Sequence, residues 1–457
     1  MSLAQDRTLR TFTLCVLYVA QGIPWGFMAT TLPGYLTQKG VDAQIVGAML
    51  SFTTLPYAFK WIWGPIIDSF TLPRFGRRRP WIIFAQAMMA LTVIVLVTFD
   101  LGTEIKLLTW TILIHTVFNA LQDVSVDAMA TDLLDDDERG RANGLMYGSK
   151  YLGGFIGGAV VAHIIAKTNL DTALIVQTVA LCAIMLVPIF VKERDTNTSD
   201  NLPAAVVRSG APQQTIAQTI SSLGKAFSFR STIVCALLML GGTFAIGVIS
   251  ANGYTLFIGR LGWTFDQLSV ITGGWGLLVG GVCAALTGFL VDWLGRRTVA
   301  AIASCALATG WLVFSQLEPH WTNHTLVYFA AFWEAAWQAI WLVSLYSLCM
   351  DLSSPKVAGS QFAAYMALSN FSTTIGYQFA ARILGKLGGF VHLYIGMAIV
   401  QLALVALLVP IDPKELRRAE AAGEPVAKRG NIGLVALLLL VAFLIVMTIK
   451  KTIDIVG

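Results

Sequence analysis

One stretch decides the fold of this chain, Gly288-Phe-Leu-Val-Asp292-Trp-Leu-Gly295-Arg296-Arg297, because most of its pattern occurs twice. The earlier copy is Gly64-Pro-Ile-Ile-Asp68, which is followed by Gly76 and an arginine triplet at 77–79. Each copy stands directly after a long apolar run. A pattern that recurs after equivalent runs predicts a chain of two halves built on one plan.

The composition places these halves in a membrane. Of 457 residues, 56% are hydrophobic and 12% are charged, whereas soluble domains carry about 25% charged residues. A bilayer asks for runs of about 20 apolar residues. We predict membrane-spanning helices at 11–37, 43–66, 81–99, 107–131, 142–166, 171–191, 229–258, 265–290, 298–317, 325–349, 358–384 and 391–410, with a further apolar run at 431–449.

A second pair of residues repeats in the two halves. Asp132 is followed eight residues on by Gly140, and Asp351 is followed eight residues on by Gly359. Both pairs follow the fourth span of their half, so the halves have equal topology and are related by an axis along the membrane normal. We expect an all-α membrane protein of two six-helix bundles in a pseudo-two-fold arrangement, plus one extra C-terminal apolar helix.

The positions of Lys and Arg predict the orientation. Most of the 31 basic residues fall on the side of the membrane that holds the N-terminus, which is therefore predicted to be cytoplasmic. These residues lie in short loops rather than on one face, so we expect no nucleic-acid partner. The expected partners are a small solute, protons and the lipid bilayer, with the chain acting as a monomer.

We divide the chain into four parts: 1–191 and 229–410 as the six-helix bundles, 192–228 as a cytoplasmic linker, and 411–457 as a basic linker with the extra hydrophobic helix. The second part of the 192–228 linker carries Ile216, Ile220, Leu223 and Phe227 at helical spacing. This spacing predicts an amphipathic helix on the cytoplasmic membrane surface, and a bare solvated loop stays open as the alternative.

The repeated glycine–aspartate–arginine loop resembles the signature loop of the major facilitator superfamily. The resemblance implies that its aspartates pair with loop arginines and neighbouring helix ends, and so latch one conformation. A carboxylate at a helix N-terminus gains about 0.3–1 kcal/mol, and an arginine can bind it with two hydrogen bonds. The residues implied in this latch are Asp68, Arg77, Arg78, Asp292, Arg296 and Arg297.

Five charged residues fall inside predicted spans: Lys60, Asp123, Asp127, Lys150 and Glu334. Each such charge costs about 2.5–3.5 kcal/mol at the bilayer centre and needs a reason. Asp123 and Asp127 share one helix face, and two close carboxylates do not both ionise easily without a cation between them. The two lysines are the candidate cations.

Two interpretations of this group compete. The aspartates and lysines could form a static buried pair that orients the first half. Alternatively, Lys60 and Lys150 bind an anionic substrate while Asp123 or Asp127 takes up a proton. Asn119 and Gln122 border the same helix face and are further candidates for substrate binding.

Glu334 is a further candidate for the proton site, because no basic partner is evident in its own half. The repeat aligns it with His115, which could titrate if suitably buried. Trp25 and Trp275 are candidates to line a cavity, because glycines and a proline interrupt the helices that carry them. Irregular backbone at membrane depth is tolerated only where protein or water lines it.

Three segments of the first half resemble a narrower family. Leu55-Pro-Tyr-Ala-Phe-Lys60-Trp-Ile-Trp-Gly-Pro-Ile-Ile-Asp68, Gln122-Asp123-Val-Ser-Val-Asp127-Ala128 and Gly22-Ile-Pro24 look like the AmpG-type muropeptide permeases and related acetyl-coenzyme A transporters. The resemblance implies import of a cell-wall fragment or another bulky anionic solute across a bacterial inner membrane, driven by the proton gradient. Siderophore importers also look like members of this branch.

A membrane enzyme or receptor on a transporter-like scaffold is the alternative from another class. The chain has no H-E-x-x-H, G-x-S-x-G or P-loop motif, and only five histidines. We therefore expect neither catalysis nor a metal or cofactor, and the absence of an ATPase motif points to secondary transport.

Overall fold

We describe a computed structural model of the chain, covering residues 2–41, 43–70, 75–135, 137–193, 216–264, 267–268, 270–354, 357–413, 415 and 418. In the first half, each predicted span coincides with one continuous or interrupted helix. The helices are α1 (Arg7–Gly26), η1 (Phe27–Thr31), α2 (Leu32–Gln38), α3 (Ala43–Thr53), α4 (Leu55–Ala58), η2 (Lys60–Ile62), α5 (Trp63–Ser69), α6 (Arg79–Val95), η3 (Leu96–Thr98), α7 (Ile105–Leu133), α8 (Arg139–Phe155), η4 (Ile156–Val160), α9 (Val161–Lys167) and α10 (Leu170–Phe190).

The second half repeats this order after α12 (Ile216–Ala226). Its helices are α13 (Arg230–Gly242), α14 (Phe244–Tyr254), η6 (Thr255–Arg260), η7 (Val270–Trp275), α16 (Gly276–Leu294), α17 (Arg296–Gln316), η8 (Glu318–His320), α18 (His324–Leu352), α19 (Ala358–Leu387) and α20 (Phe390–Leu408). The predicted C-terminal helix at 431–449 lies outside the described residues.

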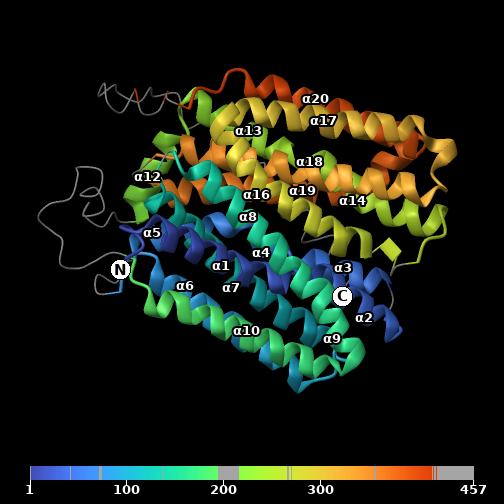
Figure 1. The fold of residues 1–457 in the computed structure, drawn as a ribbon, viewed down its shortest axis with the longest axis horizontal. Coiled ribbons are helices and arrows are strands. Elements are labelled where there is room, and N and C mark those ends of the chain that lie inside the picture. Colours follow the sequence, from blue (N-terminus) through green and yellow to red (C-terminus); the bar gives the residue numbers. More distant parts are fainter. Residues whose placement is uncertain are drawn as a thin grey trace, which may run out of the picture.

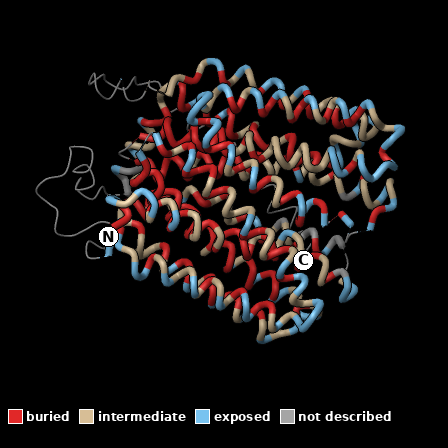
Figure 2. The backbone as a smooth tube through the Cα atoms, in the orientation of Figure 1, coloured by how far each residue is buried: buried red, intermediate tan, exposed pale blue. Residues whose placement is uncertain are grey.

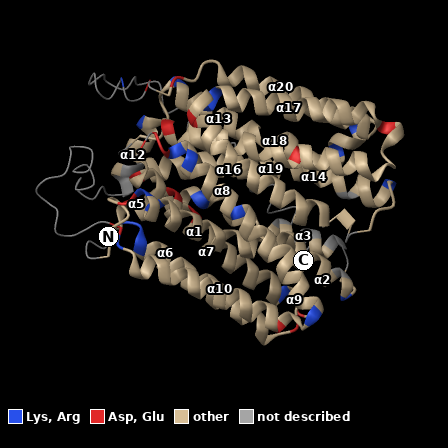
Figure 3. Ribbon diagram, in the orientation of Figure 1, with Lys and Arg blue, Asp and Glu red and all other residues tan. Residues whose placement is uncertain are grey.

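Figure 1 shows the halves side by side, the first in blue to green and the second in yellow to red. They meet along α8 and α16, and along α7 and α19. We name the end of the molecule at which α5 and α12 lie the latch end, and the opposite end, at which α2 and α9 lie, the pocket end. Charged residues gather at these two ends (Figure 3).

Nine helices among the described residues are long and apolar enough to cross a membrane. The second span is missing from this set because it is broken into α3, α4, η2 and α5. Helices α7 and α19 are long enough but too polar. Their polar residues are buried where the halves meet, as the dense red core of Figure 2 illustrates. These three spans therefore contribute the polar interior of the bundle.

Glycines let α1 and α8 pack with their backbones in contact. A Cβ atom on Gly22 would lie 2.8 Å from the Cα atom of Gly153, and one on Gly154 would lie 2.8 Å from the Trp25 ring. The glycines of the fifth span therefore serve close helix packing.

Helix α12 occurs where the sequence favours an amphipathic helix over a loop. Phe227, just after it, is buried against Tyr365 of α19 with ring centroids 5.3 Å apart. This end of the apolar face therefore packs on protein. Contact of the rest with the membrane surface stays a prediction.

Candidate functional site

Three of the intramembrane charges lie together between the halves. Lys60 Nζ is 2.6 Å from Asp123 Oδ2, and Lys150 Nζ is 3.5 Å from Asp123 Oδ1. The Lys60 side chain is 1% exposed and that of Lys150 is 24% exposed. Both lysines thus share one carboxylate, but only Lys150 is open to a solute.

The interruption of the second span places Lys60 in this group. Pro56 and Pro65 flank a short 3₁₀ turn, η2, in which Lys60 stands. Prolines remove backbone hydrogen bonds and break a continuous helix. The turn packs against both α7 and α19, so it buries the Lys60 side chain between the halves.

Asp127 has different partners from Asp123, although both lie on one face of α7. It accepts a hydrogen bond from the Tyr18 hydroxyl of α1, while its Oδ2 atom is buried with no hydrogen-bond partner among the described residues. No lysine pairs with it among those residues. Asp123 therefore pairs with both lysines, whereas the hydrogen-bond partner of Asp127 is a tyrosine hydroxyl.

Tyrosine rings surround the exposed lysine. Lys150 Nζ lies 5.9 Å from the ring centroid of Tyr18 and 6.0 Å from that of Tyr147, within range of a cation–π attraction. Tyr147 stacks on Tyr346 of the second half at 4.8 Å. The contact of Tyr147 with Tyr346 therefore joins the two halves beside Lys150.

Asn119 and Gln122 are both buried on α7. Gln122 Nε2 donates to the Leu17 carbonyl of α1 at 3.2 Å, which ties α7 to α1. The predicted binding roles of these two amides remain untested predictions.

In the first half, the latch residues form a bridge to the second half. Asp68 lies beyond the predicted second span and accepts hydrogen bonds from Arg77 at 3.2 Å and Arg78 at 2.5 Å. It also accepts from the backbone N–H of Ser360, at the start of α19, at 3.1 Å. Burial alone would raise the pKa of Asp68, but Arg78 and Arg77 outweigh it and hold that pKa below its ordinary value. Arg78 also binds Asp132 at 2.9 Å.

The second half repeats this bridge in the opposite direction. Asp292 accepts from the backbone N–H of Arg141, in the first turn of α8, at 3.1 Å. Arg296 lies 3.9 Å from Asp292 and also pairs with Asp351. Arg297, in contrast to Arg296, donates to the Val409 backbone carbonyl at 2.8 Å. Each half thus caps a helix of the other.

Glu334 and His115 lie away from the charge cluster. Glu334 is on α18 against Trp311 of α17 and near Tyr394 of α20. His115 is buried, with Nδ1 2.8 Å from the Thr92 hydroxyl of α6. The two aligned positions therefore face equivalent neighbours, inside their own halves.

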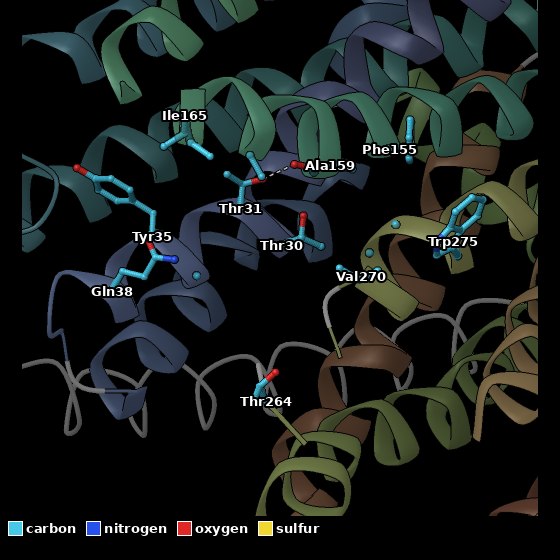
Figure 4. Close-up of a pocket in the computed structure, with 16 residues that line it drawn as sticks. Thr30, Thr31, Tyr35, Gln38, Phe155, Ala159, Ile165, Thr264, Val270 and Trp275 are labelled. Carbon is cyan, nitrogen blue, oxygen red and sulfur yellow. Dashed lines mark hydrogen bonds between the residues drawn. The ribbon is translucent and has the colours of Figure 1, made fainter. Parts of the chain in front are cut away.

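The two predicted cavity tryptophans lie nearer the pocket end. A cavity of about 620 Å³ lies there between the halves, and Trp275 lines it (Figure 4). Trp25 is not among the described residues that line this cavity, and it packs edge-to-face with Tyr151 at 6.5 Å. The structure is thus closed at the latch end and hollowed at the pocket end.

The sequence did not single out Tyr18, Tyr147, Arg141 or Ser360. Tyr18 and Tyr147 flank glycine-rich turns of α1 and α8, and an aromatic hydroxyl on a helix that packs beside a charged span is a usable signal. Ser360 and Arg141 directly follow the repeated Gly359 and Gly140, so their positions could have been found from the repeat.

The arrangement defines a class of membrane protein: two helical halves that enclose a charged cluster, with a latch at one end and a cavity at the other. Such an arrangement suits a transporter that opens to each side in turn. Comparison with known proteins places the chain more narrowly.

A family model described as the Major Facilitator Superfamily matches residues 14–377. The anhydromuropeptide permease of Escherichia coli K12 is 24% identical over 370 residues, which cover 79% of this chain and 71% of that protein. The human organic anion transporter MFSD10 superimposes with a TM-score of 0.69 at 14% identity, covering 87% of this chain and 98% of that one. The proton:xylose symporter XylE, bound to 6-bromo-6-deoxy-D-glucose, gives 0.69 at 12% identity, covering 90% and 98%.

The chain belongs to the Major Facilitator Superfamily, since the family model spans most of its length. Its resemblance to the AmpG-type branch is confirmed by the permease relative. The solved structures, at such low identity, establish the fold alone. The chain is therefore a multi-pass membrane transporter of this branch.

Proposed function

We propose that this chain is a proton-coupled symporter that imports a bulky anionic solute, of the anhydromuropeptide type, across the bacterial inner membrane. One observation carries the proposal: Lys150 is a partly exposed cation between the halves, and it shares Asp123 with a second, sealed lysine. An anionic group can take Lys150 from Asp123, because Lys60 still neutralises that carboxylate.

Charge balance explains the coupling. Two lysines and two aspartates sum to zero when all four are ionised. A solute that brings one negative charge leaves the enclosed group at minus one, and burying a net charge in a membrane is costly. A proton on Asp127 restores neutrality, because Asp127 is the carboxyl without a lysine partner among the described residues. We therefore infer uptake of one proton for each negative charge bound.

The orientation and architecture belong to the same proposal. We place the latch end and the N-terminus in the cytoplasm, with 1–191 and 229–410 as the moving halves and 192–228 as the cytoplasmic linker. The chain acts as a monomer, because one chain supplies the whole cluster. Glu334 is a weaker candidate for coupling, since it lies inside its own half.

The test is uptake into proteoliposomes with an imposed inward proton gradient. An anhydromuropeptide, acetyl-coenzyme A and a ferric siderophore are offered separately, which separates the muropeptide proposal from its alternatives within the branch. We expect accumulation of the anhydromuropeptide, abolished by a proton ionophore. If no solute moves faster than in empty vesicles, the proposed function is wrong.

A further inference from the structure

The cavity at the pocket end is formed where wide helical turns converge. Eight of its sixteen lining residues come from three π-helical segments, η1, η4 and η7. Such turns are rare and occur often at functional sites. At membrane depth, irregular backbone is tolerated only where it is buried in protein or lines a water-filled space. The convergence of three such segments on one cavity indicates a functional site that is formed by the fold.

Thr31 shows how the irregular backbone is satisfied. Its hydroxyl, on η1, lies 3.0 Å from the Gly157 carbonyl and 2.7 Å from the Gly158 carbonyl of η4, and a dashed line in Figure 4 marks such a bond. Thr30 donates to the Gly26 carbonyl at 2.7 Å. These bonds hold the wide turns open within the first half, while η7 supplies the opposite wall.

The lining chemistry differs from that of the charge cluster. Among the described residues that line the cavity, none is Asp, Glu, Lys or Arg. It offers the aromatic faces of Trp275, which is 59% exposed, and Tyr35, and the uncharged polar groups of Thr30, Gln38 and Thr264. Its volume of about 620 Å³ lies within the usual range for small-molecule sites.

We propose that this cavity is a second binding site, which takes an uncharged, hydroxyl-bearing ring of the solute. The ring stacks on Trp275 and places its hydroxyl groups against the threonine and glutamine side chains. The inference rests on the proposed function in one respect: the solute's anionic end is the part that reaches Lys150. The cavity selects the neutral end.

The distance to the charge cluster fits one solute with two ends. Lys150 and the cavity residue Phe155 are five residues apart on α8, which is about 8 Å along the helix axis. Trp25 and Tyr151 meet between these levels. This aromatic pair therefore lies between the proposed neutral site and Lys150 along α8.

Equilibrium binding in detergent, measured by isothermal titration calorimetry, tests the site without transport. The probe is a neutral disaccharide, N,N′-diacetylchitobiose, which has no anionic group. We expect it to bind wild-type protein, and Trp275→Ala to weaken binding about tenfold, as the loss of one aromatic contact implies. Trp275→Phe retains most of the affinity. Trp293→Ala, which removes an 80% exposed tryptophan on α16, serves as the matched control.

Two further variants make the outcome decisive. Ala162→Leu fills the cavity and should abolish binding, whereas Lys150→Met should keep the disaccharide affinity and lose uptake of the anionic solute. The inference is overturned if no neutral disaccharide binds, or if Lys150→Met weakens binding as much as Trp275→Ala does. If binding persists while uptake fails for every solute, the second site stands and the proposed function falls.

Discussion

Asp68 and Ser360 are joined by two hydrogen bonds across the boundary between the halves, one from the Ser360 backbone N–H at 3.1 Å and one from its hydroxyl at 2.5 Å. Asp68 lies in the last turn of α5, and Ser360 lies in the first turn of α19. One residue of the first half therefore holds a helix start of the second half, in addition to its pairing with Arg77 and Arg78.

Asp68→Asn is expected to open the latch end. A hydrogen bond to a charged group contributes about 1.5–3 kcal/mol, so its loss shifts the open-to-closed ratio about tenfold or more. Spin labels at Phe75 and Trp293, in a cysteine-free background, report this by a longer distance between them. Ser360→Ala should shift the ratio less.

The control for the latch is Glu318→Gln at the pocket end. Its ion pair with Arg260 at 2.7 Å is solvent-exposed, and such pairs contribute little. A shift as large as that of Asp68→Asn in this variant would show that the distance change does not report on the latch.

The contribution of Asp68 to the latch should be insensitive to pH over the physiological range. The pKa of Asp68 is lower in the folded protein than in the unfolded chain, so its stabilising effect is present above the unfolded value of about 4 and is lost as pH falls through the folded value. The difference between wild type and Asp68→Asn should stay constant from about pH 8 to pH 5. Spin-label distances across that range check this, and a change near neutrality would contradict it.

Asp127→Asn should separate binding from coupling. The asparagine keeps the size of the side chain and can still contact Tyr18, but it cannot exchange a proton. We expect solute binding to persist and gradient-driven accumulation to be lost, with counterflow exchange retained. Unchanged accumulation would move the coupling role to Asp123 first, and then to Glu334.

We expect substitutions in the charge cluster to lower the free energy of unfolding by unequal amounts. Asp123→Asn removes the carboxylate that pairs with the buried Lys60, a change that costs about 3–5 kcal/mol. Lys60→Met should cost less, because Asp123 keeps Lys150. The double variant should regain stability over Asp123→Asn alone. Thermal unfolding in detergent measures all three, and equal midpoints for the single variants would contradict this account.

Helix packing gives a fifth expectation. Gly22→Ala should lower the yield of folded protein, because the added Cβ atom would press on the backbone of α8 at Gly153. Gly385→Ala is the matched control, since nothing lies within 4 Å of the Cβ position at that helical glycine. Size-exclusion profiles of the two variants compare them directly.

Much of the fold could be predicted from the sequence, because apolar runs and repeated loops are local properties. The spans, the equal halves and the arginine-rich loops follow from them. The partner of each buried charge does not follow from such local properties. Asp123 and Asp127 share a helix face, yet only Asp123 meets the lysines, because the break at η2 and the glycine contact of α1 with α8 set which helix lies opposite each residue.

Contacts between the halves were the least predictable. The stacking of Tyr147 on Tyr346 and the bond from Ser360 to Asp68 join residues far apart in sequence, and their geometry follows from how two finished bundles dock. Glu334 shows the same limit. Its helix is largely apolar and has no distinct polar face, so only packing determines that Glu334 faces α17 and α20.

The reciprocal capping of α19 by Asp68 and of α8 by Asp292 has a mechanical consequence. Each carboxylate belongs to one half and caps a helix of the other half. A rigid rotation of the two halves must therefore break both sets of hydrogen bonds in the same movement. The closed arrangement is then all-or-none. We expect arrangements with one broken bridge to be rare, because they lose its hydrogen bonds without opening a path between the halves.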